Sequence, residues 1–215
     1  MKNLLLGDSL KIIPTMQEGC VDITFTSPPY NRKRNDKYEH YTDVITDYYL
    51  FLKKIIEQCL FVTKGVVFIN LQKNYYNKKE VFKIIGEFSG DLFDIFIWEK
   101  SNPMPANGNN ITNAYEMILC FTKTLKSNKT YTKNHLTTSV ARMLPEHKAM
   151  MHEDVARFFI SNFSNKGDVI FDPFLGTGTT AIVAEEMDRE WLGIELVPEY
   201  YTVAKNRIIE RRKKT

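Results

Sequence analysis

The sequence predicts an α/β protein with one mostly parallel, seven-stranded sheet and helices on both of its faces. Short apolar, β-branched or aromatic runs alternate with amphipathic stretches of helical period along the whole chain. Several runs, such as GVVFINL at 65–71, are nearly continuous apolar stretches rather than strict alternations, which is typical of strands covered by helices on both sides.

The same patterns place the individual elements. Strands are expected at 3–7, 21–27, 65–71, 92–100, 115–123, 168–174 and 190–196. Helices are expected at about 44–63, 78–88, 152–164, 178–188 and 198–212. No helical stretch separates the fourth and fifth strands, so we expect these two to form an antiparallel edge. Long polar segments are expected to be loops, and in a compact domain such loops are often functional; they are 31–43, 101–113 and 124–139.

Length and charge set broad limits. A chain of 215 residues suits a single domain, here 1–215, with a sizeable core. The formal net charge of +3 neither indicates nor opposes a polyanionic partner. Basic residues gather at 31–37 and 207–214, although a charge run is usually only a solvated face.

Cysteine usage and the N-terminus indicate the compartment. The cysteines, Cys20, Cys59 and Cys120, are widely spaced in apolar surroundings, so we expect reduced core residues and no metal site. Asp8 interrupts the first apolar run too early for a signal peptide. No apolar run approaches the roughly 20 residues needed to cross a bilayer. We therefore expect a cytoplasmic protein with no membrane partner.

A glycine turn lies near the C-terminus, in DVIFDPFLGTGTTAIVAEEM at 168–187, which predicts a strand, a tight turn and a helix. Gly176 and Gly178 can adopt backbone angles closed to other residues and let a ligand approach the main chain. No lysine precedes Thr179, so the turn is not a Walker phosphate loop. Glu195 ends the next expected strand and could accept both hydroxyls of a ribose. A tight turn with a merely solvated glutamate is the alternative.

A second motif, TSPPY at 26–30, ends the expected strand 21–27. Pro28 and Pro29 fix the backbone and carry no donor, so the neighbouring carbonyl groups are held rigidly. Ser27 adds a hydroxyl, and Tyr30 adds a flat aromatic face. Rigid acceptors beside a stacking ring suit the exocyclic amine of a planar base. A plain β-turn also explains the prolines, but it explains the aromatic residue less well.

With these motifs, the chain resembles the amino-methylating DNA methyltransferases, which carry a [DNS]-P-P-[YFW] motif. The resemblance extends over GDSL (7–10), TSPPYN (26–31), WEK (98–100), YEMILCFTK (115–123) and GDVIFDPFLGTGTT to YYTVAKNRI (167–208). It implies a Rossmann-like, S-adenosylmethionine-dependent methyltransferase fold. The family's beta arrangement is circularly permuted so that the catalytic motif precedes the cofactor motif, which explains the late glycine turn.

The resemblance also assigns residues. It implies S-adenosyl-L-methionine around the glycine turn, with Glu195 on the ribose and Asp8 near the adenine ring. The cofactor-binding residues are Asp8, Phe171, Asp172, Pro173, Phe174, Gly176, Thr177, Gly178, Thr179 and Glu195. The catalytic residues on the target amine are Ser27, Pro28, Pro29 and Tyr30, with no metal. The segment 146–164 resembles the part that lines the methionine end, but it lacks the commoner His-Pro, which leaves His147 and Lys148 without a role.

The target base follows from the motif type. We expect Ser27 Oγ and the Pro28 carbonyl to accept the two amine hydrogens, and Tyr30 to stack on the flipped base. In the family, SPP-type motifs lean towards cytosine N4, with adenine N6 as the alternative. No cysteine follows a proline, which disfavours covalent C5-cytosine chemistry.

Double-stranded DNA is the expected partner. Arg32, Lys33 and Arg34, directly after the catalytic motif, are expected to contact phosphates. A small target-recognition insertion is expected at about 123–145, including Lys126 and Lys129, with help from 101–113. This insertion is short, so a brief recognition sequence or a homodimer is expected. A cognate restriction endonuclease encoded nearby is a further hypothesis.

Two rival functions are open at this point. RNA and protein-glutamine methyltransferases use related Pro-Pro-aromatic motifs, but they usually place the cofactor motif first. A non-catalytic DNA-binding protein on a methylase scaffold has no need of the motif residues, yet Ser27, Tyr30, Gly176, Gly178 and Glu195 are all intact.

Overall fold

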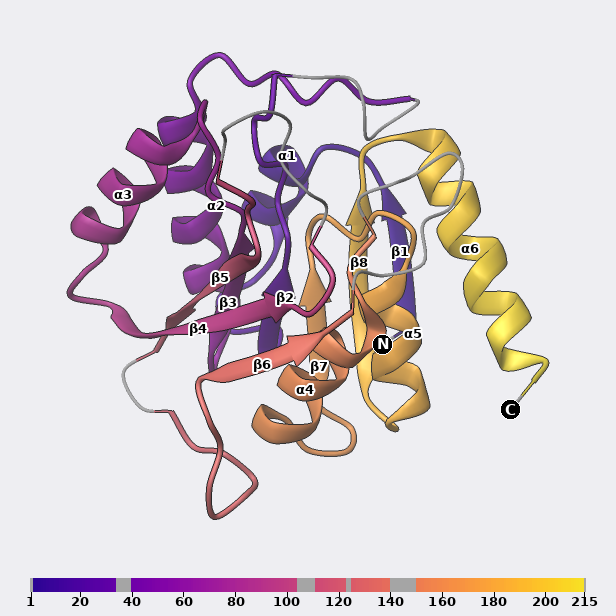
Figure 1. Ribbon diagram of the computed structural model, residues 1–215. Helices are drawn as coiled ribbons and strands as arrows, with labels where there is room; N and C mark the ends of the chain where they lie inside the picture. Colours follow the sequence, from indigo (N-terminus) through magenta and orange to yellow (C-terminus); the bar gives the residue numbers. More distant parts are fainter. Residues whose placement is uncertain (1, 34–39, 104–110, 123–124, 140–149, 215) are drawn as a thin grey trace.

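The computed structural model describes residues 2–33, 40–103, 111–122, 125–139 and 150–214, which form a single sheet flanked by helices (Figure 1). The sheet has eight strands in the order β1-β8-β7-β2-β3-β5-β4-β6. The strands are β1 (Lys2–Leu6), β2 (Ile23–Thr26), β3 (Val67–Leu71), β4 (Leu92–Lys100), β5 (Tyr115–Phe121), β6 (His135–Thr138), β7 (Val169–Asp172) and β8 (Glu190–Glu195).

Helices cover both faces of this sheet. They are α1 (Ser9–Ile12), followed by the 3-10 turn η1 (Ile13–Thr15), α2 (Tyr48–Val62), α3 (Lys78–Glu87), α4 (Glu153–Phe163), α5 (Thr179–Glu186) and α6 (Pro198–Arg212). Apolar residues of α4, α5 and α6 form a core with one face, and those of α2 and α3 form a core with the other. Successive strand residues alternate between the two cores, as Phe68 and Ile69 of β3 do.

The predicted fold class is confirmed, with one difference in the sheet. All seven expected strands and all five expected helices are present. The antiparallel pair β4–β5 is also present, but it is not at the edge, because β6 pairs in parallel with β4 beyond it. The β6 sequence, HLTT, has a single buried residue, Leu136, so its pattern predicts a polar loop rather than a strand.

Strand direction brings the two sequence motifs together. The neighbouring strands β8, β7, β2 and β3 are all parallel, so the loops after them gather at one edge of the sheet. β2 pairs directly with β7, with Thr24 opposite Phe171. The segments 27–30 and 173–178 therefore leave adjacent strands at the same edge, although they lie far apart in the chain.

The helices and the cysteines bear on the expectations about membrane spans and thiols. Within the described residues, no helix is both long and apolar enough to cross a bilayer. Cys20, Cys59 and Cys120 carry free thiols, and the latter two are buried. Burial raises the pKa of Cys120 to about 12 and also raises the pKa of Cys59, so both thiols are protonated at neutral pH.

Candidate active site

The glycine turn joins β7 to α5 and packs tightly against α6. Gly176 and Gly178 have φ angles of 56° and 88°, in the left-handed region that favours glycine. A Cβ atom on Gly178 would lie 3.2 Å from the Cβ of Ala204 in α6. Thr177 is buried, and its Oγ1 accepts a hydrogen bond from Arg207 Nη1 at 2.9 Å. The turn is therefore held in one conformation by the helix behind it.

Glu195, at the end of β8, faces this turn. Its Oε2 accepts from the Gly176 amide and its Oε1 from the Val197 amide, each at 2.8 Å. Burial is the main cause that raises the pKa of Glu195, and the charge of Asp172 raises it further. An ionised carboxylate has about four acceptor positions, so the two amide contacts leave capacity for the hydroxyls of a ribose.

Asp8 lies beside the end of β8. The Gly7 amide donates to the Glu195 carbonyl at 2.8 Å, which fixes the neighbouring Asp8 next to that strand. Asp8 caps α1, because its Oδ1 accepts from the Leu10 amide at 3.0 Å. The structure thus brings Asp8 and Glu195 together at one side of the glycine turn.

Asp172 and Phe171 were expected to bind the cofactor, but their side chains lie inside the protein. Phe171 is fully buried in the core against α2. Asp172 accepts from the hydroxyls of Thr26 at 2.6 Å and Thr180 at 2.7 Å, and from the Phe174 amide at 3.0 Å. Asp172 therefore ties the end of β2 to the glycine turn, directly behind the catalytic motif, and supports the turn from within.

Replacing Asp172 with asparagine is expected to make the thermal stability less dependent on pH. Burial raises the pKa of Asp172. The folded state thus binds more protons than the unfolded state between the two pKa values, and this contribution to stability falls as pH rises. Asparagine keeps the acceptor for Thr26 and the Phe174 amide but carries no charge.

We expect Asp172→Asn to melt at a higher temperature than the wild type above the folded-state pKa of Asp172, with a smaller decrease in Tm as pH rises from about 4, the ordinary pKa of an aspartate. The exposed Asp91→Asn is the matched control and should behave as the wild type. A wild-type pH slope in Asp172→Asn would contradict the account.

The carbonyl groups of the catalytic motif differ in whether they accept a hydrogen bond. Tyr48 donates its hydroxyl to the Pro29 carbonyl at 2.8 Å, and two asparagine amides donate to the Tyr30 carbonyl at 2.9 and 2.7 Å. No described residue donates to the Pro28 carbonyl. The Pro28 oxygen and the neighbouring Ser27 hydroxyl are therefore the acceptors that a ligand at the end of β2 would meet.

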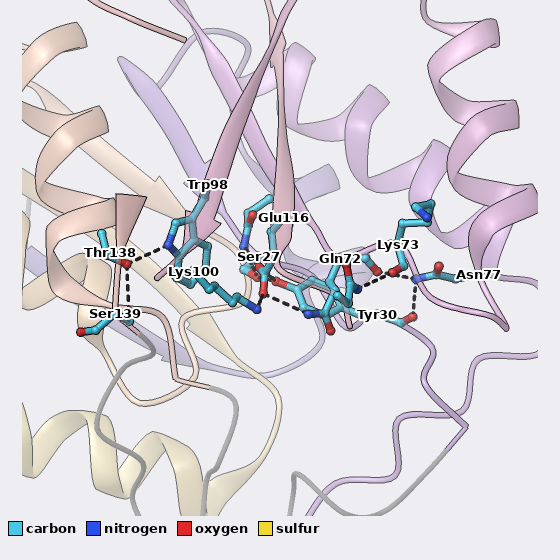
Figure 2. Close-up of polar contacts among 12 residues, drawn as sticks. Ser27, Tyr30, Gln72, Lys73, Asn77, Trp98, Lys100, Glu116, Thr138 and Ser139 are labelled. Carbon is cyan, nitrogen blue, oxygen red and sulfur yellow. Dashed lines mark hydrogen bonds and ion pairs between the residues drawn. The ribbon is translucent and has the colours of Figure 1, made fainter. Parts of the chain in front are cut away.

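The motif rests on a polar network that the sequence did not reveal (Figure 2). The hydroxyls of Ser27 and Tyr30 lie 2.6 Å apart, and Tyr30 donates to Glu116 Oε2 at 2.8 Å. Asn70 Nδ2 lies 2.7 Å from the same carboxylate oxygen, and Lys100 forms an ion pair with Oε1. Asn70 and Glu116 are polar residues within otherwise apolar strands, which is the signal that could have identified them.

Asp43 is a second residue that the sequence analysis missed. It is fully buried, and its carboxylate accepts from the amides of Asn31 at 2.9 Å and Arg32 at 3.0 Å. These contacts fix the start of the basic loop after the catalytic motif. Lys33 is exposed, with Nζ 6.0 Å from the centre of the Tyr76 ring. Arg34 lies outside the described residues.

Lys126 and Lys129 do not lie near the catalytic motif. Both are exposed in the loop between β5 and β6, which is at the opposite end of the sheet. Asn128 anchors this loop by donating to the Ser164 carbonyl at 2.6 Å, just before β7 begins. Lys126 also lines a hollow with Asp22 and Asp168, which precede β2 and β7.

The described residues of the expected recognition insertion at 123–145 therefore lie at two different ends of the sheet. Residues 125–134 lie at the end where β2 and β7 begin, whereas Thr138 and Ser139 lie at the end that carries the catalytic motif. Thr138 Oγ1 accepts from Trp98 Nε1 at 2.8 Å, close to Lys100 (Figure 2). His147 and Lys148 lie outside the described residues.

This fold is that of S-adenosylmethionine-dependent methyltransferases, with the catalytic motif and the glycine turn on adjacent strands. The chain belongs to the DNA methylase family of N6 and N4 methyltransferases, whose family model matches residues 21–206.

Named relatives support this assignment. The chain is 25% identical over 248 residues to the Type II methyltransferase M.HinfI of Haemophilus influenzae, covering 98% of this chain and 69% of that protein. It is 29% identical over 208 residues to the Type II methyltransferase M.MwoI of Methanothermobacter wolfeii, covering 86% of this chain. The chain spans only 30% of the length of M.MwoI.

Solved structures show the same fold. The cytosine-N4-specific PvuII DNA methyltransferase superposes with a TM-score of 0.77 at 20% identity, covering 99% of this chain and 92% of that one. The M1.HpyAVI–SAM complex superposes with a TM-score of 0.70 at 22% identity, covering 97% of this chain and 99% of that one.

Proposed function

We propose that this protein transfers a methyl group from S-adenosylmethionine to the exocyclic amine of a base flipped out of double-stranded DNA, namely N4 of cytosine. The observation that carries the proposal is the pairing of β2 with β7, which places Ser27 and the glycine turn at one edge of the sheet. A methyl donor on the turn and an amine at the end of β2 would then share one site.

The residues present fit S-adenosylmethionine. Glu195 has acceptor capacity for ribose hydroxyls, and Gly176 and Gly178 offer backbone without side chains at the turn. Asp8 follows Gly7, whose amide bonds to the Glu195 carbonyl, so Asp8 lies beside the end of β8, in keeping with a role near the adenine ring. When bound, the cofactor supplies an activated methyl group. The solved M1.HpyAVI and TTHA0409 structures include complexes with this molecule.

The exocyclic amine needs activation, because its lone pair is delocalised into the base. Ser27 Oγ and the Pro28 carbonyl would accept its two hydrogens and favour a pyramidal nitrogen with an available lone pair. Holding the amine nitrogen in line with the methyl group is the main contribution to the rate, since orientation of this kind can lower the activation barrier by about 7–11 kcal/mol. Tyr30 would stack on the extruded base, which stabilises it by about 1–3 kcal/mol.

Cytosine N4 is proposed for two reasons. The SPP form of the motif leans towards cytosine in the family, and the PvuII enzyme, which shares the fold, is named as cytosine-N4-specific. Adenine N6 is the alternative. A second copy of the chain and a cognate restriction endonuclease are proposed partners, in line with the Type II names of the relatives.

Calorimetric titration with S-adenosylmethionine, followed by tritium transfer to plasmid DNA and nucleoside analysis, tests the proposal. We expect cofactor binding and labelled N4-methylcytosine. Labelled N6-methyladenine would reassign the base while keeping the site. Cofactor binding or DNA binding without any transfer would contradict the proposal and favour a non-catalytic DNA-binding protein.

Replacing Arg32 and Arg34 together with alanine is expected to reduce the salt dependence of DNA binding. The plot of log K against log salt has a negative slope, and each lost phosphate contact reduces its magnitude by about 0.9 in duplex DNA. The magnitude should therefore decrease by about 2. Filter binding or fluorescence anisotropy across a salt series measures it.

The Lys126→Ala and Lys129→Ala double variant is the matched comparison. These lysines lie at the opposite end of the sheet, so we expect its slope to equal that of the wild type. A reduced slope in this variant, with an unaltered slope in the arginine variant, would place the DNA at the end of the sheet where β2 and β7 begin.

A further inference from the structure

A chain of hydrogen bonds runs from the Ser27 hydroxyl to a buried carboxylate that the proposed reaction does not yet use (Figure 2). Ser27 Oγ lies 2.6 Å from the Tyr30 hydroxyl oxygen, which lies 2.8 Å from Glu116 Oε2. Glu116 is near the start of β5, and its side chain is only 6% exposed. Lys100, at the end of β4, forms an ion pair with Glu116 Oε1.

The chemistry of these groups fixes the direction of each hydrogen bond. A carboxylate only accepts, so Tyr30 gives its one hydroxyl proton to Glu116. Ser27 must then donate its own proton to the Tyr30 oxygen, which leaves the Ser27 lone pairs able to accept from a ligand. Asn70 Nδ2 has two hydrogens and lies nearer to Tyr30 and Glu116, at 2.8 and 2.7 Å, than to Ser27 at 3.3 Å.

We propose that Ser27, Tyr30 and Glu116 form a proton relay that carries a proton away from the reacting amine nitrogen. The proposal rests on the amine methylation proposed above. As the nitrogen acquires its methyl group, one N–H bond breaks and that proton binds Ser27 Oγ. The Ser27 proton moves to the Tyr30 oxygen, and the Tyr30 proton moves to Glu116 Oε2. The nitrogen loses one proton and Glu116 gains one, with no change in oxidation state.

The relay explains how a weakly basic serine can serve this reaction. Because each hydroxyl accepts one proton as it gives up another, neither Ser27 nor Tyr30 has to carry a full charge. The proton moves overall from a positively charged nitrogen to a carboxylate, which is the favourable direction. Lys100 is a positioning residue, since it orients Glu116 and lies with Nζ 5.2 Å from the centre of the Trp98 ring.

A purely structural role for Glu116 makes a different prediction. If Glu116 only neutralised the buried Lys100, the Tyr30 hydroxyl would not matter to the reaction, and the Tyr30 ring alone would serve as the stacking surface. The variant Tyr30→Phe separates these possibilities, because it keeps the ring and removes the hydroxyl.

The experiment measures single-turnover methyl transfer to plasmid DNA by the full chain with S-adenosylmethionine. For Tyr30→Phe we expect dissociation constants for cofactor and DNA within about twofold of the wild type. We expect its transfer rate to fall by about 10²–10⁴, the usual contribution of a positioned base. Tyr131→Phe, an exposed tyrosine in the β5–β6 loop, is the matched control and should keep the wild-type rate.

The variant Glu116→Gln supplies a second readout, because it keeps the size of the side chain and removes the final proton acceptor. Among the described residues, the polar side chains in contact with the Glu116 carboxylate are those of Lys100, Tyr30, Asn70 and Gln72. We expect Glu116→Gln to transfer methyl groups about as slowly as Tyr30→Phe, with dissociation constants for cofactor and DNA within about twofold of the wild type.

Controls keep the outcomes distinct. Glu99→Gln, whose carboxylate contacts His135 and Thr137 instead, should retain the wild-type rate. A full transfer rate in Tyr30→Phe, or in a folded Glu116→Gln, would overturn the relay and leave the amine site intact. If Glu116→Gln fails to fold, Tyr30→Phe decides alone. A wild-type protein without methyl transfer would contradict the proposed function itself.

Discussion

Replacing Ser27 with alanine is expected to slow methyl transfer by about 10²–10³ while leaving the affinity for S-adenosylmethionine within about twofold of the wild type. The substitution removes one of the two acceptors that a target amine would meet at the end of β2. It also removes the hydroxyl that bonds Tyr30 at 2.6 Å. Losing a single preorganised hydrogen-bonding group at a reacting centre typically costs this much in rate. Single-turnover transfer and calorimetry measure the two quantities separately.

Ser161→Ala is the matched control for this variant. The Ser161 hydroxyl bonds to the Phe158 carbonyl within α4, away from the candidate site. We expect its transfer rate to equal that of the wild type. If Ser27→Ala transfers methyl groups at a rate within about threefold of the wild type, Ser27 does not hold the amine.

Replacing Glu195 with alanine is expected to weaken cofactor binding at least tenfold. A hydrogen bond to a charged group contributes about 1.5–3 kcal/mol, and about 1.4 kcal/mol is a factor of ten in the dissociation constant. Glu195→Gln keeps the shape and one oxygen for the Gly176 or Val197 amide, so a smaller loss is expected. Calorimetric titration with S-adenosylmethionine measures both variants.

Glu199→Gln, an exposed position in the first turn of α6, is the control and should bind the cofactor normally. A dissociation constant for Glu195→Ala equal to that of the wild type would remove Glu195 from the ribose site. Melting curves identify any loss of binding that comes from an altered turn, because the same carboxylate accepts the Gly176 and Val197 amides.

Much of the fold could be predicted from local patterns. The apolar runs marked seven of the eight strands, and helical periodicity marked the five longer helices. The resemblance implied that the target amine at Ser27 and the cofactor on the glycine turn share one site, and the β2–β7 pairing agrees with it. These features depend on the composition and periodicity of side chains within one element.

The polar network and the eighth strand depend on partners that no local pattern contains. Asn70 and Glu116 are isolated polar residues in buried strands, and only the pairing of β3 with β5 brings them together. The strand β6 buries only Leu136, so this segment forms a strand because it pairs with β4 and not because of its own apolar pattern. The end of the sheet at which Lys126 lies depends on the direction of β5, which sequence periodicity does not specify.

The most direct test is a crystal structure of the protein with an unreactive cofactor analogue and duplex DNA that contains the target base. We expect the base outside the helical stack, with its amine nitrogen about 2.7–3.2 Å from both Ser27 Oγ and the Pro28 carbonyl oxygen. The cofactor analogue should lie on the glycine turn beside Glu195. A target base that stays stacked in the duplex, or an analogue bound away from this turn, would contradict the account.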